Sequence, residues 1–345
     1  MKKNALIMSW GVPAVLRNTQ RGLKAIGWDS HIVMRGAAGG QSWVRDAVQY
    51  IKDARPAFVF SWQRLYGEAR PIWRAARDYG ARLVIMDFGL WPHYWTAMFD
   101  PRGENRESAL VGAFDDIEAD PAQRQYIDEQ RPVVDEIARA IERSAAEAPR
   151  VLGKLKGGMP KERNFVFLAL QRCARGRPDK VLELDAVPAR RHPLDIAKAV
   201  IAEAEKQNTF VVLKQHFQGI NLDGVLPQRG PYHHLIPMFQ DRQENGWVCG
   251  WCIRHCSHLV TVNSTTWSQA LALGKPAACM GRGWFSHNNI VKECRLVREA
   301  LPTPEPAGER GKRFVALMIS RQCHQSGLRR GALRKPLHRI YPDAF

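Results

Sequence analysis

The sequence predicts an α/β protein with two domains, each built on a mostly parallel sheet. The chain has 345 residues, which is long for one hydrophobic core, and its 45% hydrophobic and 25% charged content is typical of a globular protein. Short β-branched runs alternate with segments of helical periodicity in both halves of the chain. Because parallel strands need crossover connections, this alternation favours Rossmann-like domains.

In the first half, apolar runs predict strands, and amphipathic segments between them predict helices. The predicted strands are 5–10, 31–34, 57–61 and 83–86, and the predicted helices are 15–26, 44–51 and 72–79. Gly11 follows the first strand, but no G-x-G-x-x-G motif accompanies it. We therefore do not expect a nicotinamide or flavin cofactor.

The second half repeats the alternation after a segment rich in Gly, Pro and Lys at 149–161. The predicted strands are 165–170, 210–213, 234–238, 259–262 and 277–280, and the predicted helices are 194–206, 248–256 and 267–273. An acidic helical region at 115–148 is assigned to the first domain. We therefore expect domains at 1–150 and 151–307, followed by a basic C-terminal tail at 308–345.

The charge balance predicts an anionic partner. The net charge is +17, which suits nucleic acid, an anionic membrane or a charged substrate. The predicted tail lacks interleaved aromatic residues and any nucleic-acid reader motif, which favours peripheral contact with an anionic membrane or a solvated tail. No apolar run approaches the roughly 20 residues of a membrane span, and the N-terminal apolar run is too short for a signal peptide. These features, with an odd number of cysteines, predict a cytoplasmic protein with reduced thiols.

Two polar motifs follow predicted strands in the second half. Lys214-Gln215-His216 ends one strand, and Asn263-Ser264-Thr265 follows another. If both strands belong to one parallel sheet, their carboxyl ends converge on a single ligand site. A lysine charge, a histidine and hydroxyl donors would then form a phosphate clamp. The alternative is that Ser264 or Thr265 only caps the following helix.

An aromatic and acidic segment follows the fourth predicted strand of the first half. It reads DFGLWPHYWTAMFDPRGEN and contains the acids Asp87, Asp100 and Glu104. Aromatic faces stack on apolar sugar faces, and carboxylates act on hydroxyl groups or the anomeric carbon, so the segment suits a sugar. The alternative is a structural loop that packs its aromatic side chains between domains.

A cluster of metal-ligand residue types lies near the end of the second half. Cys249, Cys252 and Cys256 lie beside His255 and His258, which invites a zinc or iron–sulfur interpretation. The cysteine spacing of i, i+3 and i+7 instead places the thiols on one helix face, where buried cysteine behaves as a small apolar residue. We therefore expect core packing and no metal.

These segments together resemble the bacterial capsule polysaccharide family of Kdo transferases, which take the acidic sugar Kdo from a CMP donor. Residues 88–105 resemble the family's acidic-Gly segment and the segments after it, and 165–171 resembles its strand ending in Leu-Gln. Lys214-Gln215-His216 resembles the Lys-x-His-Pro motif. Residues 263–271, with Gly-Lys-Pro at 274–276, resemble the Asn-Ser-Thr-x-Gly-x-Glu-Ala-Leu motif and its ending. Phe217, Trp267 and Gln269 depart from these motifs.

The resemblance implies a GT-B-like fold, in which two Rossmann-like domains face a cleft, and a glycosyltransferase that moves Kdo from CMP-Kdo to a saccharide or glycolipid without a metal or cofactor. Its implied catalytic residues are Asp100, Asp87 and His216. Its implied donor-binding residues are Lys214, His216, Asn263, Ser264, Thr265 and Gln269. Its implied sugar or acceptor contacts are Trp91, His93, Glu104 and Asn105. A UDP-sugar-dependent GT-B enzyme, a non-catalytic polysaccharide-binding or export protein, and a basic nucleic-acid binder are the alternatives.

Overall fold

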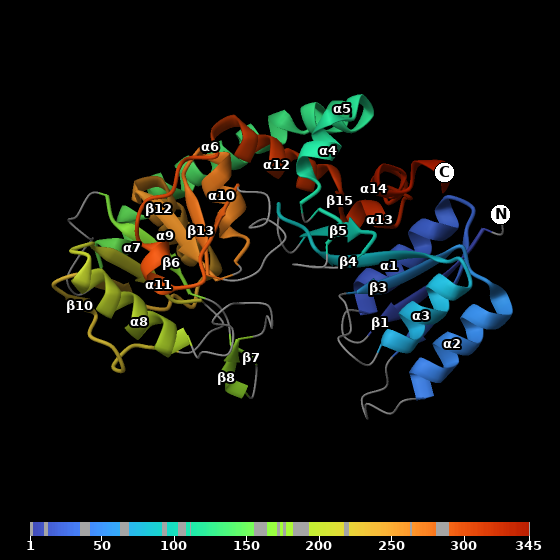
Figure 1. The fold of residues 1–345 in the computed structure, drawn as a ribbon, viewed down its shortest axis with the longest axis horizontal. Helices are drawn as coiled ribbons and strands as arrows, with labels where there is room; N and C mark the ends of the chain where they lie inside the picture. Colours follow the sequence, from blue (N-terminus) through green and yellow to red (C-terminus); the bar gives the residue numbers. More distant parts are fainter. Residues whose placement is uncertain are drawn as a thin grey trace. The chain divides into compact units, whose positions relative to one another are not determined.

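The chain forms two compact α/β units, each with its own sheet (Figure 1). The computed structural model describes residues 3–9, 13–34, 42–62, 69–91, 95–102, 108–110, 112–154, 164–170, 173–174, 177–181, 193–216, 221–262, 264–280 and 290–344. Unit 1 comprises Met1–Ala113, Ile117–Tyr126 and Leu317–Phe345, and unit 2 comprises Phe114–Asp116 and Ile127–Ala316. The predicted fold class, with two sheets dominated by parallel strands, is confirmed.

Unit 1 contains a six-stranded sheet in the order β15-β5-β4-β3-β1-β2. Its strands are β1 (Asn4–Ser9), β2 (Asp29–Met34), β3 (Phe58–Trp62), β4 (Arg82–Phe88), β5 (Thr96–Asp100) and β15 (Gln322–His324). Strands β1 to β4 are parallel, as predicted. Strand β5 runs antiparallel to β4 and β15 antiparallel to β5, so the sheet gains an edge that the sequence analysis did not predict.

Helices cover both faces of the unit 1 sheet. They are α1 (Pro13–Ala25), α2 (Ser42–Ala54), α3 (Arg70–Asp78), α13 (Gln325–Leu328) and α14 (Arg334–Ile340), followed by the short helix Pro342–Ala344. Leu16 and Leu23 of α1 share one core with Leu328 and Leu337 of the C-terminal segment. Helices α2 and α3 bury their apolar stripes in a second core on the other face.

Unit 2 contains a seven-stranded sheet in the order β10-β11-β9-β6-β12-β13-β14. Its strands are β6 (Val166–Ala169), β9 (Val211–Lys214), β10 (Arg229–Gly230), β11 (His233–Ile236), β12 (His258–Thr261), β13 (Ala277–Cys279) and β14 (Lys292–Glu293), and β7 (Cys173–Ala174) and β8 (Arg177–Val181) form a separate ribbon. All seven strands except β10 pair in parallel. Every residue of β6, β9 and β12 is buried, which is typical of central parallel strands covered on both faces.

The remaining helices belong wholly or partly to unit 2. They are α4 (Phe114–Ala119), α5 (Pro121–Glu129), α6 (Arg131–Glu147), α7 (Pro149–Leu152), α8 (Pro193–Lys206), α9 (Arg242–His255), α10 (Thr266–Ala272), α11 (Val297–Ala300) and α12 (Gly308–Ser320). Helices α4, α5 and α12 are divided between the units. Helix α8 shares an apolar core with β6, β9 and β12.

The expected domain boundary near residue 150 differs from the structure, because α6 packs against α9 of unit 2. A Cβ atom built on Gly250 of α9 would lie 2.8 Å from Cβ of Ser144, so the two helices approach closely. The guanidinium of Arg254 also donates to Glu142 at 2.8 Å. The apolar stripe of α6 predicts a buried face, but it does not say which sheet that face covers. Unit 2 therefore begins well before the predicted linker.

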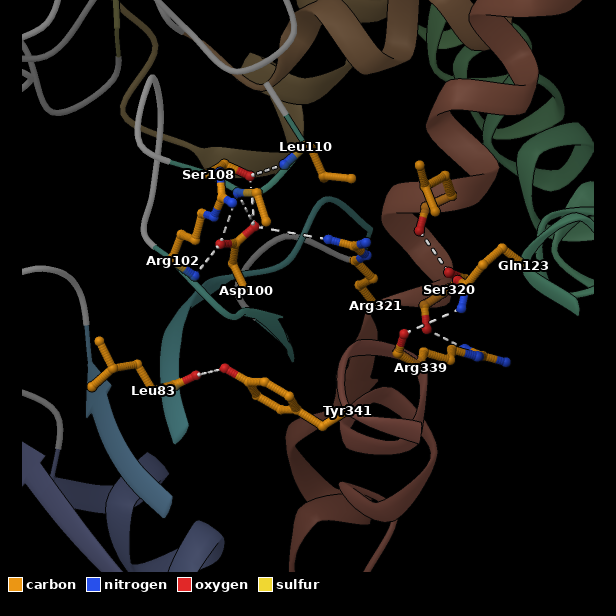
Figure 2. Close-up of polar contacts among 12 residues, drawn as sticks. Leu83, Asp100, Arg102, Ser108, Leu110, Gln123, Ser320, Arg321, Arg339 and Tyr341 are labelled. Atoms are coloured by element: carbon orange, nitrogen blue, oxygen red, sulfur yellow. Dashed lines mark hydrogen bonds and ion pairs between the residues drawn. The ribbon is translucent and has the colours of Figure 1, made fainter. Parts of the chain in front are cut away.

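The expected basic tail at 308–345 also differs from the structure. The segment forms α12, β15, α13 and α14, and its residues from Leu317 onward belong to unit 1. Its apolar residues include Leu328 and Leu333, which are fully buried. The hydroxyl of Tyr341 donates to the carbonyl of Leu83 at 2.7 Å (Figure 2). Within the described ranges, no helix is long and apolar enough to cross a membrane.

Candidate functional site

The described residues of the two polar motifs, Lys214 to His216 and Ser264 to Thr265, lie at the carboxyl end of the unit 2 sheet. Strands β9 and β12 flank β6, and both pair with it in parallel. Ala169 of β6 is level with Lys214 on one side and with Thr261 on the other. With strands spaced about 4.8 Å apart, these two flanking residues are roughly 10 Å from each other. The predicted convergence of the strand ends is confirmed, and such an edge is where ligands bind in open α/β sheets.

Gln215 anchors the chain around His216. Its side chain is 1% exposed and donates to the carboxylate of Asp223 at 2.8 Å and to the carbonyl of Ile236 at 3.4 Å. Its side-chain oxygen accepts a hydrogen bond from the backbone N–H of Leu222 at 2.6 Å. The half-buried His216 therefore follows a residue that is fixed from three directions. The sequence analysis missed Gln215, because a glutamine between two charged residues carries no signal of burial.

Lys214 lies on the face of the sheet that α9 covers. The residue is 6% exposed, and its ammonium donates to the side-chain oxygen of Asn245 and to the carbonyl of Gln215 at 3.3 Å. Burial lowers the pKa of Lys214, and the neighbouring thiols of Cys249 and Cys252 act weakly in the opposite direction. A phosphate contact would require the ammonium to leave Asn245, so the predicted role of Lys214 stays a prediction.

The turn after β12 holds its hydroxyl groups in different ways. The hydroxyl of Thr261 accepts from the backbone N–H of Ser264 at 2.9 Å, which shapes the turn. Thr265 occupies the N-cap position of α10, but its side chain makes no capping hydrogen bond. Gln269 lies one turn further along α10 and on the same face as Thr265, because residues four apart are neighbours on a helix. Thr265 therefore does not cap the helix through its side chain, whereas the hydroxyl of Ser264 accepts from the backbone N–H of Thr266 at 3.4 Å, so the capping alternative stays open for Ser264.

The cysteine cluster lies along α9, as the spacing predicts. Cys252 is fully buried, and Cys256, directly after the helix, donates its thiol hydrogen to the carbonyl of Ile253 at 3.3 Å. Burial raises the pKa of Cys256 to about 12. His258 is also buried, and its Nε2 atom lies 2.9 Å from the carbonyl of Ala300. Among the residues with a described position, no three His, Cys, Asp or Glu side chains are arranged to hold a metal ion.

The buried thiols are expected to make the protein unstable in alkali. The pKa of Cys256 is about 12 in the folded state and about 9 in the unfolded chain, so the unfolded chain loses the proton first and unfolding becomes easier as the pH rises above 9. Each such thiol lowers the free energy of unfolding by at most about 1.4 kcal/mol per pH unit. Denaturant titrations at pH 8, 9.5 and 10.5 should give a shallower decline for Cys256→Ala than for the parent chain, and equal declines would contradict the assignment.

Asp87 lies near the carboxyl end of β4 in unit 1. It is half-buried and is level with Met98 of the antiparallel strand β5. The turn after it is held from β15, because the side-chain oxygen of Gln322 accepts from the N–H of Leu90 at 2.9 Å and its amide donates to the carbonyl of Trp91 at 2.7 Å. The sequence analysis missed Gln322, since its partners lie more than 200 positions away.

Asp100, the other acid predicted to be catalytic, lies inside unit 1 (Figure 2). Its carboxylate is 3% exposed and accepts hydrogen bonds from the hydroxyl of Ser108 at 2.5 Å and from the N–H groups of Arg102 and Ala109 at 2.8 and 3.1 Å. The guanidinium of Arg321 lies 3.9 Å away, and burial lowers the pKa of that guanidinium. Asp100 therefore links Arg102, Ser108 and Ala109 to Arg321, which favours a structural role over attack on a substrate.

Replacing Asp100 by Asn is expected to destabilise the protein by about 3 kcal/mol. The change removes the charge that compensates the buried Arg321, and one amide N–H would face the donors of Ser108 and Ala109. Asp343→Asn is the matched control, because its ion pair with Arg82 is exposed and is expected to contribute less than 1 kcal/mol. Chemical denaturation of both variants measures the difference. Equal losses would contradict a buried structural role for Asp100.

The predicted sugar contacts are described only in part. His93, Glu104, Asn105 and the donor-site residue Asn263 lie outside the described residues. The indole of Trp91 is half-buried. Nearby, Trp95 is 65% exposed, and its ring lies parallel to that of His324 with centroids 6.4 Å apart. Trp95 and His324, which the sequence analysis did not select, form an exposed aromatic pair next to the aromatic segment.

Solved structures with a similar fold include two of KpsC from Thermosulfurimonas dismutans. A β-Kdo 2,7 transferase structure of KpsC matches 95% of this chain and 98% of its own length, with a TM-score of 0.54 and 10% identity. A β-Kdo 2,4 transferase structure of KpsC matches 92% and 90%, with a TM-score of 0.53 and 13% identity. The chain has the fold of the KpsC transferases. This KpsC-like fold confirms the structural resemblance predicted from the motifs. No protein-family model matches the chain, and no curated protein is similar to it in sequence.

Proposed function

We propose that the chain is a glycosyltransferase that moves an acidic sugar, Kdo, from a CMP donor to a saccharide or glycolipid acceptor. The observation that carries the proposal is the edge of the unit 2 sheet, where His216 follows β9 and the Ser264–Thr265 turn follows β12, on either side of β6. The KpsC-like fold supports the same activity, since two solved structures with this fold are Kdo transferases.

Unit 2 would bind the donor through a histidine, two hydroxyl groups and a side-chain amide. His216 would donate a hydrogen bond to the donor phosphate and stabilise the charge that develops as the glycosidic bond breaks. The hydroxyls of Ser264 and Thr265 would donate to the same phosphate, and Gln269 would hydrogen-bond the ribose. CMP leaves with its phosphate already ionised, so this binding needs no metal in principle.

Unit 1 would supply the carboxylate. Asp87 is half-buried near the carboxyl end of β4, and the carboxylate of Asp100 accepts hydrogen bonds from Arg102 and Ser108. If transfer retains the anomeric configuration, the Asp87 carboxylate would attack the anomeric carbon; if transfer inverts it, the same carboxylate would take the proton of the acceptor hydroxyl.

Nucleotide selectivity is the direct test of the donor. At a CMP concentration of ten times the Kd, binding should raise the free energy of unfolding by about 1.4 kcal/mol and the Tm by about 2–4 °C, whereas UDP and GDP should raise it less. The His216→Asn variant should lose most of this shift. His31→Asn is the matched control, because His31 is an exposed histidine of β2 in unit 1.

The outcomes separate the alternatives. Stabilisation by UDP but not by CMP would replace Kdo by a UDP-sugar donor. CMP binding without release of CMP from CMP-Kdo in the presence of saccharide acceptors would favour a non-catalytic binding protein. Equal CMP shifts for the parent chain and for His216→Asn would exclude His216 from the donor site.

A further inference from the structure

One surface of unit 1 carries cations and no acids. It consists of the exposed face of α1 together with the segment 325–340, and we call it the basic surface. Its exposed cations are Arg17, Arg21 and Lys24 of α1 and Arg330, Arg334 and Lys335 of the C-terminal segment. Neither α1 nor 325–340 contains an aspartate or glutamate.

The fold brings these two segments together although about 300 residues separate them (Figure 1). The guanidinium of Arg329 donates to the side-chain oxygen of Asn18 at 2.7 Å. A Cβ atom on Gly331 would lie 2.8 Å from a methyl carbon of Ile26, so the backbone of the C-terminal segment approaches α1 closely. Asn18 and Gly22 lie where α1 contacts the C-terminal segment. Arg17 and Arg21 directly precede them in α1, so these cations lie beside that contact.

The cations of the basic surface are not neutralised by the protein. Within the part of the chain that the structure describes, none of the six makes an ion pair. Arginines on the surface of unit 2 differ, because several have a carboxylate partner. The pairs are Arg310–Asp115 and Arg313–Asp128 at 2.7 Å and Arg254–Glu142 at 2.8 Å. Part of the +17 charge excess is therefore concentrated on the basic surface.

We propose that the basic surface binds the anionic headgroups of a phospholipid bilayer. Clusters of four to eight Lys and Arg residues on helices attract anionic lipids, and each cation within a Debye length of the bilayer strengthens binding about fivefold. Single-stranded nucleic acid is the less suitable partner, because neither segment contains Phe, Trp or Tyr on which bases could stack. The contact is electrostatic and reversible, because the exposed large hydrophobic residues of the described chain include none from α1 or 325–340 that could insert into the bilayer.

Vesicle co-sedimentation of the full chain tests this proposal. The parent should bind vesicles of 30% phosphatidylglycerol in phosphatidylcholine and release them as NaCl rises from 50 to 500 mM. It should not bind vesicles of pure phosphatidylcholine. The triple variant Arg17→Gln/Arg21→Gln/Lys24→Gln should bind about a hundredfold more weakly, from three factors of five. The control variant Lys198→Gln/Arg295→Gln/Arg298→Gln removes the same charge from exposed positions of unit 2 and should bind like the parent.

Three results would overturn the proposal. The first is equal vesicle affinity for the parent and the α1 triple variant, with circular dichroism showing that both are folded. The second is equal weakening by both triple variants, which would mean that net charge alone decides. The third is tighter binding of a 20-base-pair DNA duplex than of vesicles at the same salt, lost in the α1 triple variant, which would assign the surface to nucleic acid. None of these results depends on whether CMP binds, so the donor assignment is judged separately.

Discussion

Replacing Asp87 by Asn is expected to lower the rate of the proposed sugar transfer about a thousandfold or more. The amide can neither attack the anomeric carbon nor take a proton from an acceptor hydroxyl, so the change removes the carboxylate chemistry of either stereochemical course. Chemical denaturation checks that Asp87→Asn is folded under the conditions of the assay. CMP release from CMP-Kdo in a single turnover, with and without acceptor, measures the effect.

The Asp100→Asn variant is the control that separates loss of a catalytic carboxylate from loss of a structural one. That variant is expected to lose stability, and where it stays folded it should keep most of its activity, because Asp100 acts on its own loop. Our assignment of the two acids would be reversed if the Asp87→Asn variant transferred sugar at the parent rate and the folded Asp100→Asn variant did not.

The elements that position the donor residues follow from local sequence signals. Strands β9 and β12 are short apolar runs that end at polar residues, and their carboxyl ends share one edge because the runs alternate with helices. Gly274, with a φ of +71°, ends the segment of α10 as the sequence predicts. Local composition is enough to predict each of these elements, because the signal for a strand or a helix end lies within or directly beside the element.

The choice between the two acids depends on contacts that no local pattern contains. Asp100 is enclosed by Ser108 and by Arg321, which lies 221 positions away. Strand β5 was not predicted, because all five of its residues are buried and it therefore lacks the alternation that marks a half-exposed strand. The basic C-terminal segment was interpreted as a tail because its charges outnumber its buried leucines, although those leucines decide its packing.

Replacing Gly89 by Ala is expected to lower activity about a hundredfold and stability by about 2 kcal/mol. A Cβ atom at this position would lie 2.5 Å from the side-chain oxygen of Gln322 and 2.9 Å from Cβ of Thr96. The turn after Asp87 must then move, and overpacking of this kind costs stability while a shift of about 1 Å at a reacting group lowers the rate. Thermal unfolding and single-turnover CMP release measure the two effects.

Two further variants decide whether the turn itself carries the effect. Gly246→Ala in α9 is the control, since nothing lies within 4 Å of its added Cβ and alanine suits a helix interior, so it should keep the parent rate. Gln322→Ala removes the hydrogen bonds to Leu90 and Trp91 without adding volume, and it should lower the rate with a smaller loss of stability. Because Gly89→Ala and Gln322→Ala displace the same turn, their effects on the rate should be less than additive. Fully additive effects would mean that the two residues act on activity through different parts of unit 1.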